Sequence, residues 1–288
     1  MLIHLNGRLV PEGEAVVSVF DRGFLFGDGV FESMRAYHGR VFRPRQHLER
    51  LARSAALVGL EGPLEAGSLE AWIDALLQAN RLEDARVRLT LTRGGGRPGD
   101  YVGGEGPPTL VISAAPFAGL DAAVVDSGVA VTVASRRAIP AECLDPAIKS
   151  TSRIVSVLAR REASRRGAFE TLLLDARGRL TEGTSSNLFV VAGKGLLTPA
   201  VSGGALPGVT RAAVLEVAAA SGLTVSEADL PFAALDTADE IFLTNTSWQV
   251  LSVVQVDGRR VGTGRPGPVT LDLLARYRDL VRRECPGA

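Results

Sequence analysis

The stretch LDPAIKSTSRI, residues 144–154, contains Lys149, one of two lysines in the chain. Lysine and arginine together number 32, so arginine fills the other cationic positions. Either residue can carry a solvent-exposed charge, but only lysine offers a primary amine whose pKa can fall into the working range of an enzyme. Such an amine can attack a carbonyl group and form a Schiff base. The sequence therefore makes Lys149 a candidate catalytic residue.

Lys194, the other lysine, has a simpler explanation. The stretch AGKGL, residues 192–196, is typical of a hairpin turn between two strands. Scarcity alone leaves a chemical and a structural role for Lys149 equally open, so the rest of the chain must distinguish them.

Composition excludes several classes of protein. The 288 residues suffice for one large domain or two ordinary ones, and 46% hydrophobic with 22% charged residues is normal for a globular protein. The formal net charge is zero, which argues against nucleic acid or an anionic membrane as the main partner. No run of 18 apolar residues predicts a membrane span, and the first residues lack a signal-peptide core, so we expect a cytoplasmic protein.

Cysteine and histidine are scarce. Cys143 and Cys285 are too few for a disulfide framework. His4, His38 and His47 all lie early in the chain, and none has the spacing typical of metal ligands, so we expect no metal site. A Ser-His-Asp triad would have to use these same histidines, which argues against one.

Two hairpins, two amphipathic helices and two strands are predicted in the first 117 residues. The hairpins turn at Asn6-Gly7 and at His38-Gly39. In chain order, the segments are 1–10, 29–43, 44–60, 69–80, 85–93 and 109–117. This order predicts a small α+β domain at 1–117.

The segment AGLDAAVVDSG, residues 118–128, is rich in small residues and weakly patterned, so we expect an interdomain loop there. Beyond it, hairpin patterns predominate and predict a larger, mostly β domain with helices at 129–288. One helix is expected at Ser150–Arg166, and LPGVTRAAVLEVAAASG, residues 206–222, predicts a turn feeding another.

Three polar features of the second half of the chain, and one on the helix predicted at 44–60, each allow either a functional or a purely structural interpretation. Glu182 precedes a glycine after a strand, where a carboxylate is usually a solvated turn residue. LPGVTR (206–211) leads into a helix N-terminus, which favours an anion such as phosphate but also merely starts a helix. TNTSWQ (244–249) can cap backbone groups or bind phosphate oxygens. Arg50 lies on a predicted helix, where most arginines face solvent.

Together these features supply an amine, a carboxylate, two turns suited to phosphate and several arginines. That set fits pyridoxal phosphate. This cofactor needs a Schiff-base lysine, an acidic partner for its pyridine nitrogen and a phosphate-binding cup.

The order and spacing of the motifs resemble the class IV aminotransferases, which are the fold-type IV pyridoxal-phosphate enzymes. Glu182 of EGTSSNLF stands 33 residues after Lys149, and LPGVTR and the TNT turn follow. The resemblance extends from DRGFLFGDGVFES (21–33) to DEIFLTNTSWQV (239–250), which is nearly the whole chain. It implies a two-domain α+β fold. The family includes branched-chain and D-amino acid aminotransferases and aminodeoxychorismate lyase.

The resemblance assigns roles to residues at matching positions. Lys149 corresponds to the Schiff-base lysine and proton carrier, and Glu182 to the partner of the pyridine nitrogen. The implied cofactor-binding set is Arg50, Val209, Thr210 and Thr246 at the phosphate, Leu206 on the ring face, Arg137 near the ring hydroxyl, Ser185 and Asn187 beside the ring, Asn245, Lys149 and Glu182. Substrate contacts are expected from Phe31, Ser33, Arg93, Arg97 and Ser247.

Some positions depart from individual branches of the family. Branched-chain enzymes commonly carry a tyrosine where Ile154 stands, and their FEG is FES here, which introduces Ser33. The loop TRGGGRPGDY (92–101) has two arginines but lacks the histidine of D-amino acid aminotransferases. Ser33, Arg153 and Asn245 favour the lyase branch.

Two reactions share the cofactor motifs. In an aminotransferase the lysine removes the Cα proton of an amino acid, and a 2-oxo acid eventually leaves. In aminodeoxychorismate lyase the same start leads to release of pyruvate and formation of 4-aminobenzoate. We expect an aminotransferase acting on an amino acid and a 2-oxo acid, with the lyase as the alternative. Intact Lys149 and Glu182 argue against a third possibility, a catalytically idle anion-binding domain.

The resemblance also implies a homodimer. In that family the active site lies between two domains and is completed by a partner subunit. The glycine-rich loop at 92–101 fits a segment that reaches over a substrate.

Overall fold

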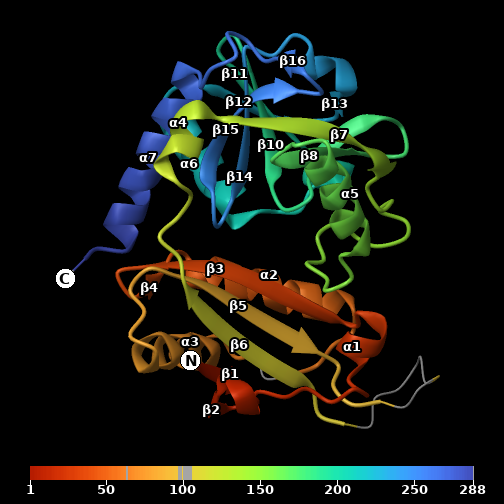
Figure 1. The fold of residues 1–288 in the computed structure, drawn as a ribbon, viewed down its shortest axis with the longest axis vertical. Coiled ribbons are helices and arrows are strands. Elements are labelled where there is room, and N and C mark those ends of the chain that lie inside the picture. Colours follow the sequence, from red (N-terminus) through yellow and green to blue (C-terminus); the bar gives the residue numbers. More distant parts are fainter. Residues whose placement is uncertain (63, 97–98, 100–105, 288) are drawn as a thin grey trace. The chain divides into compact units, whose positions relative to one another are not determined.

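The computed structural model describes residues 1–62, 64–96, 99 and 106–287 (Figure 1). The fold is α+β and divides into two compact units. Unit 1 comprises Met1–Ala118, Ile148–Ser152 and Val281–Ala288, and unit 2 comprises Gly119–Ala147 and Arg153–Leu280. The expected domains at 1–117 and 129–288 stay a prediction.

Unit 1 is built on an antiparallel sheet, six-stranded within the described residues, with the order β2-β1-β6-β5-β3-β4. Its strands are β1 (Leu2–Leu5), β2 (Arg8–Pro11), β3 (Gly29–Tyr37), β4 (Arg40–Val41), β5 (Ala85–Thr92) and β6 (Thr109–Pro116). Its helices are α1 (Arg22–Phe26), α2 (Pro44–Leu57) and α3 (Ala66–Ala79).

Both predicted hairpins of unit 1 are confirmed. Asn6 and Gly7 have φ of 48° and 88°, and His38 and Gly39 have φ of 50° and 75°. Two successive left-handed residues are what a two-residue turn needs if it is to match the twist of the flanking strands. The expected helix at 69–80 begins earlier, at Ala66, because the Glu65 side chain accepts hydrogen bonds from the backbone N–H groups of the first turn.

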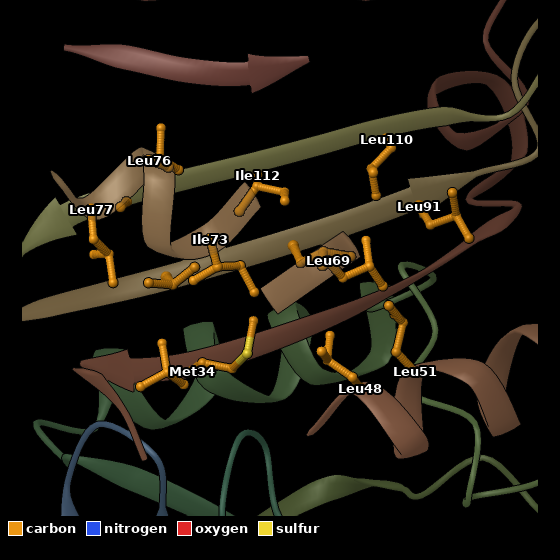
Figure 2. Close-up of a cluster of buried hydrophobic side chains, with 14 of the residues drawn as sticks. Met34, Leu48, Leu51, Leu69, Ile73, Leu76, Leu77, Leu91, Leu110 and Ile112 are labelled. Atoms are coloured by element: carbon orange, nitrogen blue, oxygen red, sulfur yellow. The ribbon is translucent and has the colours of Figure 1, made fainter. Parts of the chain in front are cut away.

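The core of unit 1 lies between the sheet and helices α2 and α3 (Figure 2). In β5, alternate residues face this core, so Val87 and Leu89 are buried while Arg86 and Arg88 are exposed. The core residues labelled in Figure 2 are Met34, Leu48, Leu51, Leu69, Ile73, Leu76, Leu77, Leu91, Leu110 and Ile112. Burying each such side chain stabilises the fold by about 1.5–3 kcal/mol.

Unit 2 contains helices around a second sheet, ten-stranded within the described residues, with the order β12-β11-β10-β14-β15-β7-β8-β9-β13 and β16 paired to β15. Its strands are β7 (Val129–Arg137), β8 (Glu170–Leu174), β9 (Arg179–Gly183), β10 (Asn187–Ala192), β11 (Gly195–Pro199), β12 (Thr224–Ala228), β13 (Leu230–Pro231), β14 (Glu240–Asn245), β15 (Gln249–Val256) and β16 (Arg259–Arg260). The helices after β6 are α4 (Ala122–Ser127), α5 (Ile154–Arg165), α6 (Val209–Ala220) and α7 (Pro268–Glu284).

A single pairing closes a ring of strands in unit 2. β9 pairs with β8 and also with β10, where Glu182 lies opposite Asn187. The strands β10, β14, β15, β7, β8 and β9 therefore form a continuous circle. The residues predicted to bind the cofactor ring lie where this circle closes.

Two sequence-based predictions differ from the structure. The segment 118–128, expected to be a loop, contains α4, whose N-cap Asp121 accepts a hydrogen bond from the Ala123 backbone. The helix expected at Ser150–Arg166 begins at Ile154, because the residues before it bond to β3 instead.

Within the described parts of the chain, no helix combines the length and apolar character needed to cross a bilayer.

His4 gives the fold a measurable dependence on pH. Its side chain on β1 is 2% exposed, and its ring stacks on that of Trp72 of α3 with 4.7 Å between centroids. Burial lowers the pKa of His4. The unfolded chain therefore binds a proton at this residue before the folded chain does. Its contribution to stability is complete above the unfolded pKa of about 6.5 and is lost as the pH falls below it.

We predict that His4→Phe, which keeps an aromatic ring against Trp72, flattens the loss of stability between about pH 7 and pH 5. The measurement is the urea midpoint of the wild type and of the variant at each pH. A smaller slope remains in the variant, because burial also lowers the pKa of His47. Identical slopes in both proteins would show that His4 does not titrate on unfolding.

Candidate active site

The segment carrying Lys149 is fastened to β3 and α2 of unit 1. The Phe31 N–H donates to the Lys149 carbonyl at 2.9 Å, and the Thr151 N–H donates to the Gly29 carbonyl at the same distance. The Lys149 N–H donates to Ser54 Oγ on α2 at 3.1 Å. These backbone bonds fix the root of the Lys149 side chain.

The Lys149 side chain lies beside an aromatic ring that an arginine also contacts. Its Nζ is 4.9 Å from the centroid of the Phe31 ring, and the guanidinium carbon of Arg88 is 3.9 Å from the same centroid. Phe31 and Ser33 alternate with core residues along β3, and Ser33 is opposite Arg88 in the β3–β5 register. The structure thus brings Lys149 and the predicted Phe31 together.

Sequence reasoning does not single out Arg88, since an arginine in an alternating strand normally faces solvent. The signal that identifies it is the period of two in ARVRLTLT combined with the register to β3. That combination places Arg88 on the same face as Ser33 and Phe31.

The predicted phosphate ligand Arg50 belongs to a buried charged cluster. Its Nε and Nη2 donate to the two carboxylate oxygens of Glu32, each at 2.7 Å, and His47 Nδ1 is also 2.7 Å from Glu32 Oε2. All three side chains are at most 3% exposed. Sequence reasoning misses Glu32, whose partners lie on a different element.

Burial and charge oppose each other in this cluster. Burial by itself would raise the pKa of Glu32, but the charges of Arg50 and His47 outweigh it and hold that pKa well below its usual range. Burial lowers the pKa of His47 even though the Glu32 carboxylate opposes that shift. Glu32 therefore stays ionised at neutral pH.

In unit 2, three predicted ring-binding residues form one hydrogen-bonded frame. The Glu182 carboxylate accepts from the Leu206 N–H at 2.9 Å and from Asn187 Nδ2 at 3.3 Å. The same Asn187 nitrogen donates to the Leu206 carbonyl at 2.8 Å. Glu182 is half-buried and held from two sides, so it is not the freely solvated turn residue that the sequence alone would favour.

The predicted phosphate turn leads directly from this frame into α6. Gly208 is the N-cap, and no side chain caps the helix there. A Cβ at Gly208 would lie 2.1 Å from Asn187 Oδ1, so glycine is required for the close approach. The first N–H groups of α6, at Val209 and Thr210, form an end of a helix dipole suited to an anion.

Ser185 is held by a carboxylate that sequence reasoning misses. Glu170 is fully buried, and its oxygens accept from Thr184 Oγ1 at 2.6 Å and from Ser185 Oγ at 3.2 Å. Arg160 forms an ion pair with it at 2.9 Å. The Ser185 hydroxyl therefore supports the loop after Glu182, and its expected place beside the cofactor ring stays a prediction.

Asn245 stabilises the turn between β14 and β15 through side-chain hydrogen bonds. Asn245 Oδ1 accepts from the Ser247 and Trp248 N–H groups at 2.9 and 2.7 Å, and its Nδ2 donates to the Ser185 carbonyl at 3.1 Å. Asn245 thus caps the turn and ties it to the loop that contains Ser185, and its expected contact with the cofactor stays a prediction. Thr246 and Ser247 are half-buried in the same turn.

The structure shows the hydrogen-bond partners of Arg93, one of the predicted arginines. Arg93 donates to both carboxylate oxygens of Asp28 and to the carbonyls of Val58 and Gly59, at 2.7–3.2 Å. These hydrogen bonds tie the end of α2 to the segment before β3, and the expected substrate contact of Arg93 stays a prediction. Arg137 is exposed at the end of β7, and Arg97 lies outside the described residues.

Each unit carries part of the predicted set of residues. Unit 1 contains the fixed Lys149 amine, the cluster of Glu32, His47 and Arg50, and the Phe31–Arg88 face. Unit 2 contains the Glu182 frame beside the uncapped N-terminus of α6. No group of three or more His, Cys, Asp or Glu side chains in the described residues is arranged to hold a metal ion.

Comparisons with known proteins agree on one family. The model of class IV aminotransferases matches residues 29–256. A putative branched-chain amino acid aminotransferase of Methanocaldococcus jannaschii is 39% identical over 280 residues, covering 97% of this chain and 96% of the relative. A D-alanine aminotransferase of Listeria innocua is 32% identical, covering 99% and 98%. The crystal structure of Escherichia coli branched-chain amino acid aminotransferase has a TM-score of 0.93 at 31% identity, covering 97% and 94%.

Proposed function

The chain belongs to the class IV aminotransferase family, whose members depend on pyridoxal phosphate, and on this premise we propose that Lys149 binds that cofactor and transfers the proton in transamination. The observation that carries the proposal is the fixation of Lys149 at both its N–H and its carbonyl. A fixed backbone limits where Nζ can reach, as a proton carrier requires.

The residues present fit the cofactor. The Glu182 carboxylate would hold a proton at the pyridine nitrogen, with Leu206 and Asn187 keeping it in place. The uncapped N-terminus of α6 would bind the phosphate through the Val209 and Thr210 N–H groups, together with Arg50 and Thr246. A side chain at Gly208 would disrupt this cradle through Asn187.

Bound pyridoxal phosphate supplies a carbonyl carbon for the substrate nitrogen and a ring that takes up the electrons of the broken Cα–H bond. The Lys149 amine would remove the Cα proton and return it to the cofactor carbon on the other side of the substrate nitrogen. The Phe31 ring lies 4.9 Å from Nζ and covers one side of the amine.

The substrates are an amino acid and a 2-oxo acid. We place their carboxylate recognition at Arg88, because its guanidinium shares the Phe31 ring with Lys149 Nζ. Ser33 and Ser247 stay in the proposed pocket. One relative is named for branched-chain amino acids and another for D-alanine, so their names do not agree on the configuration of the amino donor. The absorbance experiment below distinguishes the two configurations.

The lyase stays the alternative. Of the three residues that favour it, Asn245 is engaged by the backbone of its own turn and Arg153 donates to the Thr184 carbonyl, while Ser33 lies on the Phe31 face of β3. We propose the aminotransferase because the relatives reported above are named as aminotransferases.

We predict that a single amino acid, without an acceptor, removes the visible absorption of the cofactor-loaded enzyme, and that a 2-oxo acid restores it. Transamination must leave the amino group on the cofactor between its two halves. The measurement is stopped-flow absorbance with L-leucine, L-glutamate and D-alanine, followed by 2-oxoglutarate or pyruvate.

The same preparation is assayed for pyruvate released from aminodeoxychorismate. Absence of any absorbance change with every donor, together with rapid pyruvate release, would replace the aminotransferase by the lyase. A response to D-alanine alone or to L-leucine alone sets the configuration of the donor.

We propose further that the enzyme is a homodimer, with residues 16–24 packed against a second copy. Five apolar side chains of this short segment are 44–74% exposed, namely Val16, Val17, Val19, Phe20 and Phe24. Such a cluster is typical of a surface that a partner covers.

Phe20→Ser combined with Phe24→Ser is expected to shift the chain toward monomer in sedimentation at assay concentration, because it removes apolar area from the interface. Phe232→Ser, at another exposed phenylalanine, serves as the control and should leave the wild-type mass. A wild-type enzyme that is both monomeric and fully active would refute the dimer.

A further inference from the structure

Glu32 lies on the face of β3 that is otherwise apolar. Val30, Met34 and Ala36 share this face and belong to the core that α2 and α3 cover. Phe31 and Ser33 lie on the opposite face, beside Lys149 and Arg88. A carboxylate thus enters the core directly behind the substrate-facing residues.

A buried ion pair is weak evidence of a stabilising role. Taking two charges out of water costs several kcal/mol each, and apolar replacements of similar size often do as well or better. Glu32 and Arg50 are 0% and 3% exposed, so each has lost nearly all of its contact with water. The pair therefore points to a role that apolar packing cannot fill.

The geometry fixes the orientation of the arginine. Two parallel hydrogen bonds, both 2.7 Å, join Nε and Nη2 of Arg50 to the two oxygens of Glu32. A bidentate contact sets the plane of the guanidinium as well as its position. His47, one turn earlier on α2, contacts Glu32 Oε2 and holds the carboxylate itself.

The buried face of α2 links this cluster to the lysine. His47, Arg50 and Ser54 occupy successive turns, and Ser54 Oγ accepts from the Lys149 N–H. One helix face therefore sets both the arginine and the root of the catalytic lysine.

We propose that Glu32 is a positioning residue that orients the Arg50 guanidinium toward the phosphate of the cofactor. His47 holds the Glu32 carboxylate in place. This inference rests on the proposed function, since it assumes that the cofactor binds. Glu32 itself touches neither the cofactor nor the substrate and acts through Arg50.

The test compares the affinities for pyridoxal phosphate and for pyridoxal, which lacks the phosphate. Both are titrated into the cofactor-free full chain, and their affinity ratio is the readout. In Glu32→Gln an amide N–H replaces one acceptor oxygen and faces an arginine donor, so the bidentate contact is lost. We expect the ratio to fall by about tenfold or more, the size of a charge-assisted hydrogen bond.

A double-mutant cycle separates positioning from general disruption. Arg50→Gln should lower the ratio by itself, and adding Glu32→Gln to it should lower the ratio no further. Glu240→Gln is the matched control, because it alters a buried carboxylate that caps α7 in unit 2. It should leave the ratio unchanged even if the protein becomes less stable.

Glu32→Asp covers the case in which Glu32→Gln does not fold. It keeps the charge but shortens the reach, and should give a smaller loss in the ratio. Equal losses for both ligands, or a further loss of ratio on the Arg50→Gln background, would overturn the positioning role. A wild-type chain with no preference for pyridoxal phosphate would instead overturn the proposed function and this inference with it.

Discussion

The attachment of the Lys149 segment to β3 and α2 is the constraint on which the rest of the site depends. Two backbone–backbone hydrogen bonds, with Phe31 and Gly29, and a third from the Lys149 N–H to Ser54 Oγ hold this segment. They place the Lys149 amine beside the Phe31 ring, which the Arg88 guanidinium also contacts. Without these hydrogen bonds the backbone of Lys149 would not be fixed to β3 and α2.

Buried or half-buried carboxylates organise the polar groups around this amine and in unit 2. Glu32 holds Arg50 and His47, Glu182 holds the Leu206 and Asn187 backbone and amide groups, and Glu170 gathers the hydroxyls that follow Glu182. Each carboxylate accepts several hydrogen bonds, which is the condition under which a charge withstands burial. Each of them therefore sets the position of residues that the family resemblance assigns to cofactor binding.

Local patterns in the sequence predict much of the fold, but they do not predict hydrogen bonds between residues that are far apart in the sequence. The turns at Asn6-Gly7 and His38-Gly39 follow from residue chemistry alone, and Lys149 stands out by its scarcity. The helix expected from Ser150 starts late because of bonds to β3, which lies far away in the sequence. Likewise, the sequence does not reveal that Arg93 binds Asp28 or that Asn245 accepts hydrogen bonds from the backbone of its own turn. The sequence alone does not identify Arg88 or Glu32. The β3–β5 register is needed to place Arg88 beside Ser33, and the fold is needed to show that Glu32 binds Arg50 and His47 of α2.

The central claim is that Lys149, and not Lys194, forms the bond to pyridoxal phosphate. Lys194 lies exposed in the turn between β10 and β11, whereas Lys149 is half-buried and anchored. The most direct test is borohydride reduction of the cofactor-loaded protein, followed by peptide mapping by mass spectrometry. The account predicts that the reduced cofactor is attached to the peptide containing Lys149. Attachment to Lys194, or no attachment at either lysine, would contradict it.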